Sequence, residues 1–251
     1  MLVANGPWTE LWLVRHGESI GNIAASAAEV DGADVIALDI RDADVPLSPT
    51  GREQAEALQP WLADRLSSLG SIWCSPYLRA RQTLDAALGQ DGSGIRISID
   101  ERLRDRELGV LDLLTTTGVR NLHPDEVIRR QHLGKFYHRP PGGESWADVV
   151  LRLRSFVADA PPSEHVSSTA ALVVAHDAVV MLFLYLCLDL SEAELLAFAQ
   201  SHTVANASVT HLARSSTGDR WDLMDFSNVD HLEHGGAPVT VHPGDDDVRP
   251  A

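Results

Sequence analysis

The sequence predicts an α/β fold, a three-layer α/β/α sandwich around a mixed, mostly parallel sheet with an antiparallel edge strand. Short apolar runs alternate along the chain with segments whose apolar residues recur at helical spacing, which is typical of parallel strands covered on both faces. Two late strand-like runs around a turn predict the antiparallel edge. A length of 251 residues with 44% hydrophobic residues suffices to bury the core of one such domain.

The first half of the chain contains three predicted strands. Residues 11–14 are an apolar run that leads into Arg15 and His16. After residues 48–51, apolar side chains recur at helical spacing from 58 to 69 and predict a helix. The other elements predicted here are a strand over 71–74, a helix over 76–88, a turn at 92–94 and a strand of alternating isoleucines over 95–99.

The second half repeats this alternation. An amphipathic helix is predicted over 146–157, and a buried strand over 170–175 ends at His176 and leads into a wholly apolar helix. Ser191 is expected to cap a helix over 192–200, with Glu194 completing the capping box. The last two strands are predicted over 208–213 and 221–226, around a turn at 216–218.

We expect a single domain over residues 1–251, because no repeat or low-complexity linker divides the chain. Stretches near 23–45 and 110–141 interrupt the alternation and are expected to be cap insertions. Residues 235–251 are rich in Gly, Pro and Asp, which predicts a solvated, flexible tail.

The charge of the chain excludes several classes of partner. The 36 acidic and 20 basic residues give a formal net charge of −16, which argues against nucleic acid and membrane partners. Cys74 and Cys187 lie in apolar stretches and are expected to be reduced thiols. The N-terminus lacks a signal-peptide pattern, and the apolar run 178–188 is too short to span a bilayer. We therefore expect a cytoplasmic protein, and a homo-oligomer stays open.

Three polar segments follow predicted strands and are expected to converge, because ligands of open α/β sheets bind beyond the carboxyl ends of the strands. A neutral imidazole at His16 is a competent nucleophile toward a phosphoryl group, and the guanidinium of Arg15 matches a phosphate bidentately. Gly17 lets the backbone approach a ligand and is expected to leave an amide free to donate. Arg79 stands at the start of a helix, where a cation makes sense beside a bound anion. His176 is placed to donate to a phosphoryl oxygen.

Five motifs follow one another in order along the chain, and together they resemble the signature of the histidine phosphatase superfamily of the phosphoglycerate-mutase-like, branch 1 type. The resemblance covers residues 11–226 and implies a nucleophile at His16, with Arg15, Arg79 and His176 as the phosphate pocket. It places further substrate contacts at Ser19 and Asn22 and implies no cofactor. The motifs are Arg15-His16-Gly17-Glu18, Leu47-Ser48-Pro49-Thr50-Gly51 with Gln54-Ala55, Ser75-Pro76 with Arg79-Ala80 and Gln82-Thr83, Gly142-Gly143-Glu144-Ser145, and Val174-Ala175-His176.

The general acid is expected at Asp105, where many relatives carry Glu, with Glu107 as the second candidate. A free Asp titrates near pH ~4, so the acid needs burial or a nearby phosphate to hold its proton. Asp177, directly after His176, is a departure from the family pattern without an evident role.

Basic residues are concentrated in the second insertion, among them Lys135 and Arg139. One interpretation is a solvated helix and loop; the other is a cap that recognises a second anionic group of the substrate, with Lys135 and Arg139 as contacts.

The resulting prediction is a phosphomonoester hydrolase that forms a phosphohistidine on His16 and acts on a small phosphorylated substrate without a metal. A phosphoglycerate-mutase-type isomerase and a binding or regulatory protein on the same scaffold are the alternatives. A cysteine phosphatase is excluded, because the residue six positions after Cys74 is Ala80 and not arginine. His231 and His234 near the acidic tail do not make a convincing set of metal ligands.

Overall fold

The computed structural model describes residues 8–89, 96–160, 169–215, 217–218 and 220–242. Its sheet has six strands in the order β3-β2-β4-β1-β5-β6. Strands β3, β2, β4 and β1 are mutually parallel, whereas β5 and β6 run antiparallel at one edge, which confirms the predicted fold class. The strands are β1 (Glu10–Arg15), β2 (Leu69–Cys74), β3 (Ile97–Ile99), β4 (Ala170–Ala175), β5 (Val209–Arg214) and β6 (Trp221–Asn228).

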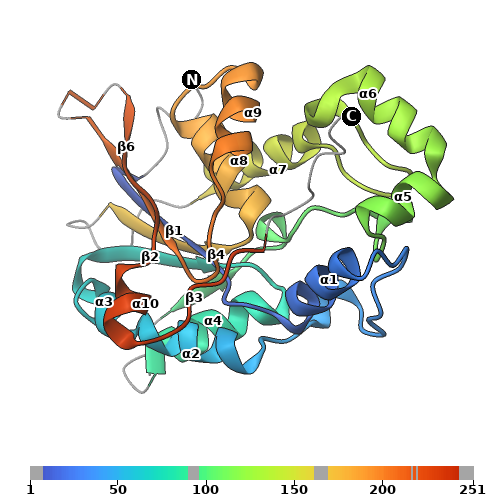
Figure 1. The fold of residues 1–251 in the computed structure, drawn as a ribbon. Helices are drawn as coiled ribbons and strands as arrows, with labels where there is room; N and C mark the ends of the chain where they lie inside the picture. Colours follow the sequence, from blue (N-terminus) through green and yellow to red (C-terminus); the bar gives the residue numbers. More distant parts are fainter. Residues whose placement is uncertain (1–7, 90–95, 161–168, 216, 219, 243–251) are drawn as a thin grey trace.

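Helices cover both faces of the sheet, as the mainly apolar strands require (Figure 1). One face carries α2 (Pro49–Ala57), α3 (Gln59–Ala63), α4 (Leu78–Leu88) and α10 (Asp230–Gly235), and the other carries α7 (Trp146–Asp159), α8 (Asp177–Cys187) and α9 (Glu192–Ser201). Side chains of β1 alternate between the two cores: Leu11 and Leu13 belong to the α7–α9 side, and Val14 to the α2–α4 side. In the described part of the chain, no helix is long and apolar enough to cross a membrane.

The predicted helix over 58–69 is wrong in its extent. The chain forms α2 and α3 in succession, then a short 3₁₀ turn over Leu66–Ser68, and Leu69 already begins β2. Pro60 lies in the first turn of α3, where its missing N–H is tolerated, and inside a continuous helix it would remove a hydrogen bond. The predicted turn at 92–94, Ile95 and Ser216 lie outside the described residues.

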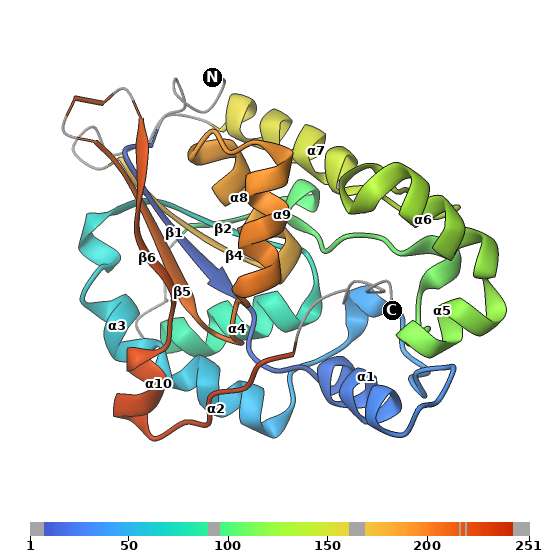
Figure 2. The same cartoon turned by 45° about the horizontal axis from the view of Figure 1, so that its top comes forward.

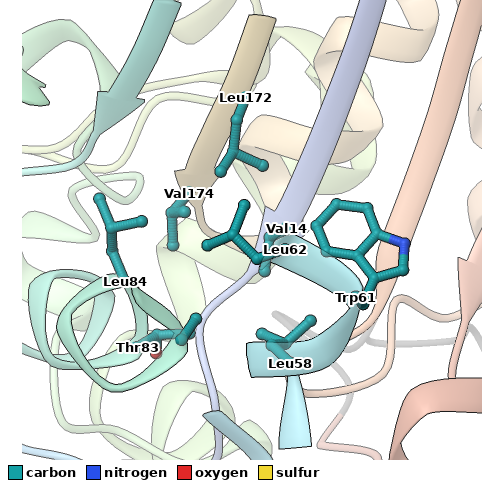
Figure 3. Close-up of a pocket in the computed structure, with 9 residues that line it drawn as sticks. Val14, Leu58, Trp61, Leu62, Thr83, Leu84, Leu172 and Val174 are labelled. Carbon is teal, nitrogen blue, oxygen red and sulfur yellow. The ribbon is translucent and has the colours of Figure 1, made fainter. Parts of the chain in front are cut away.

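The core beneath β1 and β4 contains one small void of about 10 Å³ (Figure 3). Its lining is apolar and includes Leu58, Leu62 and Leu84, and the hydroxyl of Thr83 is used elsewhere in hydrogen bonds. A dry space of this size is an ordinary packing defect and not a ligand site.

The two insertions lie together, beyond the end of the sheet to which β1 points (Figure 2). The first contains α1 (Ile20–Val30) and a 3₁₀ turn, η2 (Asp42–Asp44), and the second contains α5 (Thr116–Leu122) and α6 (Pro124–Tyr137). They are joined by a bridge between Val35 and Leu114. The Thr115 amide donates to the carbonyl of Asp34 at 3.1 Å, so the insertions form one continuous cover.

Candidate active site

The carboxyl ends of β2, β4 and β1 lie side by side, and the three polar segments meet there as expected. His16 follows β1, Arg79 lies in the first turn of α4 after β2, and His176 follows β4. All three side chains are buried, and the rings of His16 and His176 are 5.1 Å apart.

His16 has one ring nitrogen fixed and one facing the site. Its Nδ1 lies 2.7 Å from the carbonyl oxygen of Gly17, an acceptor, so Nδ1 carries the proton and Nε2 keeps its lone pair. Burial, followed by the charge of Arg79, holds the pKa of His16 well below its ordinary value. The imidazole is therefore neutral near pH 7 and available as a nucleophile.

Gly17 serves packing instead of ligand binding, which corrects one expectation. Its amide is not free, because it donates to Oγ1 of Thr83 at 3.0 Å. A Cβ on Gly17 would lie 2.5 Å from the carbonyl oxygen of Gly51, and a Cβ on Gly51 would lie 1.9 Å from that of Glu18. The two glycines therefore let the loop after β1 lie directly on the start of α2.

Arg15 is buried and oriented by main-chain oxygens. Its Nη1 donates to the carbonyl of Val204, and its Nη2 donates to that of His242 at 2.8 Å. Its buried Nε has no hydrogen-bond partner among the described residues. Burial lowers the pKa of Arg15, and the nearby carboxylate of Asp177 opposes this effect.

Residues 236–242, within the stretch expected to be a tail, lie against the site. Nε2 of His242 contacts Oε2 of Glu18 at 2.9 Å, and its Nδ1 contacts Ser26 of α1 at 2.7 Å. The amide of Gln54 donates to the Thr240 hydroxyl at 2.8 Å. This segment therefore fixes Arg15 from the C-terminal side of the chain.

Arg79 makes polar contacts along its whole guanidinium. Its Nε donates to Nε2 of His16 at 3.2 Å, and its Nη2 donates to Oδ2 of Asp105 at 3.1 Å. Its outer edge faces Asp42 of η2. Arg81 is exposed, so only one of the two arginines enters the site.

The hydroxyl of Ser75 contacts the imidazole of His176 and favours one of its tautomers. Oγ of Ser75 lies 2.8 Å from Nε2 of His176 and accepts from the amide of Tyr77 at 3.3 Å. The hydroxyl hydrogen finds an acceptor when it points to Nε2, which leaves the proton of the imidazole on Nδ1. Nδ1 lies 3.2 Å from Oδ2 of Asp105, within the distance of an ion pair.

Asp105 lies closer to the reacting groups than Glu107 does. Asp105 contacts both Arg79 and His176, whereas Glu107 is exposed and accepts from the hydroxyl of Tyr77 at 3.0 Å. Burial raises the pKa of Asp105, but the proximity of His176 and then of Arg79 outweighs burial and brings that pKa well below its usual value. The carboxylate is ionised in the unliganded site.

The four predicted substrate contacts divide into two groups. Ser19 and Asn22 form the capping box of α1, and Oδ1 of Asn22 lies 3.4 Å from the amide of Asn206, which itself donates to the carbonyl of His16. Arg139 instead pairs with Asp148 at the start of α7, and the ammonium of Lys135 lies 5.0 Å over the ring of Trp146. Of the two pairs, only the first is linked to His16, through Asn206.

Three residues at the centre of the site carry atoms that could ligate a metal, and a guanidinium lies beside them. His16, Asp105 and His176 each offer one ligand atom, and these atoms lie within 4.8 Å of one another. The guanidinium of Arg79 stands among them, with two of its nitrogens 3.1–3.2 Å from His16 and Asp105. Its charge repels a cation and attracts an anion.

Four contributing residues were missed by sequence reasoning. Ser75 and Tyr77 lie inside the motif of Arg79, so their position was a signal that could have been used. Asp42 and His242 come from an insertion and from the C-terminal segment, where no local pattern marks them.

The chain was compared with known proteins. The family model described as histidine phosphatase superfamily (branch 1) matches residues 11–228. The 6-phosphofructo-2-kinase/fructose-2,6-bisphosphatase 3 of Rattus norvegicus is 27% identical over 187 residues, which are 74% of this chain and only 29% of that protein.

Two solved structures illustrate the structural likeness. An alpha-ribazole phosphatase from Shigella flexneri superposes with a TM-score of 0.68 over 88% of this chain and 96% of its own, and at 21% identity it supports the fold alone. A mycobacterial glucosyl-3-phosphoglycerate phosphatase, solved with VO3, is 26% identical and has a TM-score of 0.65 over 87% of this chain and 98% of its own.

Proposed function

The chain belongs to branch 1 of the histidine phosphatase superfamily, and from this premise we propose that it hydrolyses phosphomonoesters of small molecules through a phosphohistidine on His16. The observation that carries the proposal is the buried Nε of Arg15, which has no hydrogen-bond partner among the described residues, in the site that also holds the neutral imidazole of His16. Buried donors without partners are costly, and a phosphoryl group satisfies them.

The proposed reaction has two steps. In the first, Nε2 of His16 attacks phosphorus, the ester bond breaks, and Asp105 gives its proton to the leaving oxygen. Arg15, Arg79 and His176 donate hydrogen bonds to the phosphoryl oxygens as their charge changes. In the second, the Asp105 carboxylate takes a proton from water, the water oxygen attacks phosphorus, and the bond to His16 breaks to release orthophosphate.

Arginines supply the positive charge that phosphoryl transfer needs, so the proposal includes no metal. Ser19 and Asn22 are proposed substrate contacts, whereas the pairing of Arg139 with Asp148 removes the support for Arg139. The joined insertions are proposed to be the cap of a single domain and to restrict the site to small substrates.

The test is hydrolysis of p-nitrophenyl phosphate with chelator present, followed by acid-labile, alkali-stable phosphorylation of the protein in rapid quench. His16→Ala is expected to lower kcat by about 10³-fold or more and to abolish labelling. His202 is an exposed histidine at the end of α9, and His202→Ala serves as the control. Activity that requires added divalent metal, or labelling that survives in His16→Ala, would contradict the mechanism. Transfer of the phosphoryl group to a second hydroxyl instead of water would indicate the mutase.

A further inference from the structure

The outer edge of Arg79 is bound by one residue of the first insertion, Asp42. Nη1 of Arg79 donates to Oδ1 of Asp42 at 2.8 Å and to its main-chain oxygen at 2.6 Å, and Nη2 donates to Oδ2 at 3.3 Å. The contact is therefore a bidentate pair reinforced by the backbone. It joins the buried arginine of the site to a carboxylate at the surface, since the side chain of Arg79 is 5% exposed and that of Asp42 is 43% exposed.

Asp42 lies on the side of Arg79 away from the nucleophile. Nε of Arg79 faces His16 and Nη1 faces Asp42, whereas Nη2 donates to both Asp105 and Asp42. A leaving group must depart away from His16, because in-line displacement places nucleophile and leaving oxygen on opposite sides of phosphorus. Asp42 lies next to Asp105, because both carboxylates accept from Nη2 of Arg79, and Asp105 is the proposed proton donor to the leaving oxygen. The carboxylate of Asp42 is therefore on the side of the site that faces the leaving group.

Two further carboxylates share this rim. Glu107 is held by the hydroxyl of Tyr77, whose ring lies 5.0 Å from the guanidinium carbon of Arg79. Burial raises the pKa of Asp112, and the nearby negative charges of Asp42 and Glu107 raise it further. Asp42, Glu107 and Asp112 thus bring negative charge together on this side of Arg79.

Three of the basic residues in the second insertion contact carboxylates of the chain. Besides the pair of Arg139 with Asp148, Glu126 of α6 accepts from Arg129 at 2.7 Å and contacts His138 at 2.9 Å. A second anionic group would have to compete with these carboxylates for Arg129, His138 and Arg139.

We propose that Asp42 is a specificity-determining residue that disfavours leaving groups with a second anionic group and favours those that carry hydroxyl or amine donors. This inference rests on the proposed phosphatase function and narrows its substrate class to monophosphates of polyols, sugars or amino alcohols. A second carboxylate or phosphate would face Asp42 at short range in a partly buried setting, where like charges repel strongly. A hydroxyl or amine would instead donate to the same oxygens.

The test compares two substrates of nearly equal size, glycerol 3-phosphate and 3-phosphoglycerate, which differ by a hydroxymethyl group against a carboxylate. The wild-type protein is expected to have the higher kcat/KM for glycerol 3-phosphate. Asp42→Asn should raise the kcat/KM for 3-phosphoglycerate relative to that for glycerol 3-phosphate by about tenfold, which is the effect of one short-range charge contact. Asp44→Asn is the matched control, because Asp44 lies on the same turn and pairs with Arg41 in solvent.

The possible outcomes distinguish a failure of the specificity role from a failure of the proposed phosphatase function. An unchanged ratio in Asp42→Asn, with p-nitrophenyl phosphate still hydrolysed, overturns the specificity role and leaves the phosphatase intact. An equal decrease of kcat/KM on both substrates also overturns the specificity role, and it would indicate that Asp42 orients Arg79. If no substrate is hydrolysed, dissociation constants of the two ligands for His16→Ala, with and without Asp42→Asn, decide the same question by binding.

Discussion

Asp105 must satisfy two demands that conflict in the unliganded site. As an acid for the leaving oxygen it needs a proton, yet His176 and Arg79 hold its pKa well below the usual value. A phosphoryl dianion bound to Arg79 competes for the same charge and raises that pKa again. Protonation of Asp105 is therefore expected to be coupled to substrate binding instead of being present beforehand.

The first prediction concerns this acid. Lowering the pH from about 8 to about 5 increases the protonated fraction of a group that titrates below this range, so kcat/KM for glycerol 3-phosphate is expected to rise. Asp105→Asn should lower kcat by about 100-fold or more on glycerol 3-phosphate, whose alkoxide needs a proton, and by less than about tenfold on p-nitrophenyl phosphate. Glu107→Gln is the control. If that variant shows the leaving-group dependence instead, Glu107 is the acid.

At the scale of the helices, the two insertions approach each other closely at Gly118. Gly118 of α5 is buried, and a Cβ placed there would lie 1.9 Å from the carbonyl oxygen of Asp34. Because Asp34 accepts a hydrogen bond from the amide of Thr115, this backbone cannot shift without loss of the junction. Gly118 therefore fixes how the second insertion sits on the first.

We predict that Gly118→Ala lowers the free energy of unfolding by about 1–3 kcal/mol, the usual cost of an overpacked site. Thr117→Ala, one residue earlier in the same helix, should change it by less than about 0.5 kcal/mol. Urea unfolding measures both values, and faster proteolysis near residues 31–45 in Gly118→Ala would locate the change. Equal stability of the two variants would mean that the insertions meet differently.

The elements that could be predicted from sequence are those with a repeated pattern. Strands such as 11–14 and 170–175 are apolar throughout, and parallel strands bring their carboxyl ends together, which is why His16, Arg79 and His176 could be grouped. The spacing of Leu66 and Leu69 fitted a helix equally well as a turn followed by a strand, so the helix boundary was missed. Local pattern does not decide between those two arrangements.

Contacts between distant loops could not be predicted, because they depend on the folded path of the chain. The residues around Asp42 do not indicate that it contacts Arg79, 37 residues later. The residues around His242 likewise do not indicate its contact with Arg15. The charge of the second insertion suggested Arg139 as a ligand, but charge alone could not reveal its contact with Asp148, nine residues later. Whether a basic side chain is free is a property of the tertiary structure.

At the scale of the whole molecule, several histidines are buried or partly buried in an acidic protein. Burial is the largest cause that lowers the pKa of His16, His138, His176 and His231. Each of them binds a proton more readily in the unfolded chain, where a histidine titrates near pH ~6.5. Below that pH the unfolded state takes up more protons than the folded state, so the stability of the whole fold decreases as the pH falls.

His231 of α10 allows this effect to be measured away from the active site. Burial lowers its pKa to about 4, so between about pH 6.5 and that value the folded chain keeps it neutral while the unfolded chain is protonated. Wild-type stability is expected to fall from pH 7 to pH 5 by about 1–2 kcal/mol more than that of His231→Gln. His234→Gln, an exposed histidine of the same helix, should keep the wild-type dependence. Unfolding in urea at both pH values gives the comparison, and parallel curves for His231→Gln and wild type would show that His231 takes up its proton without opening the fold.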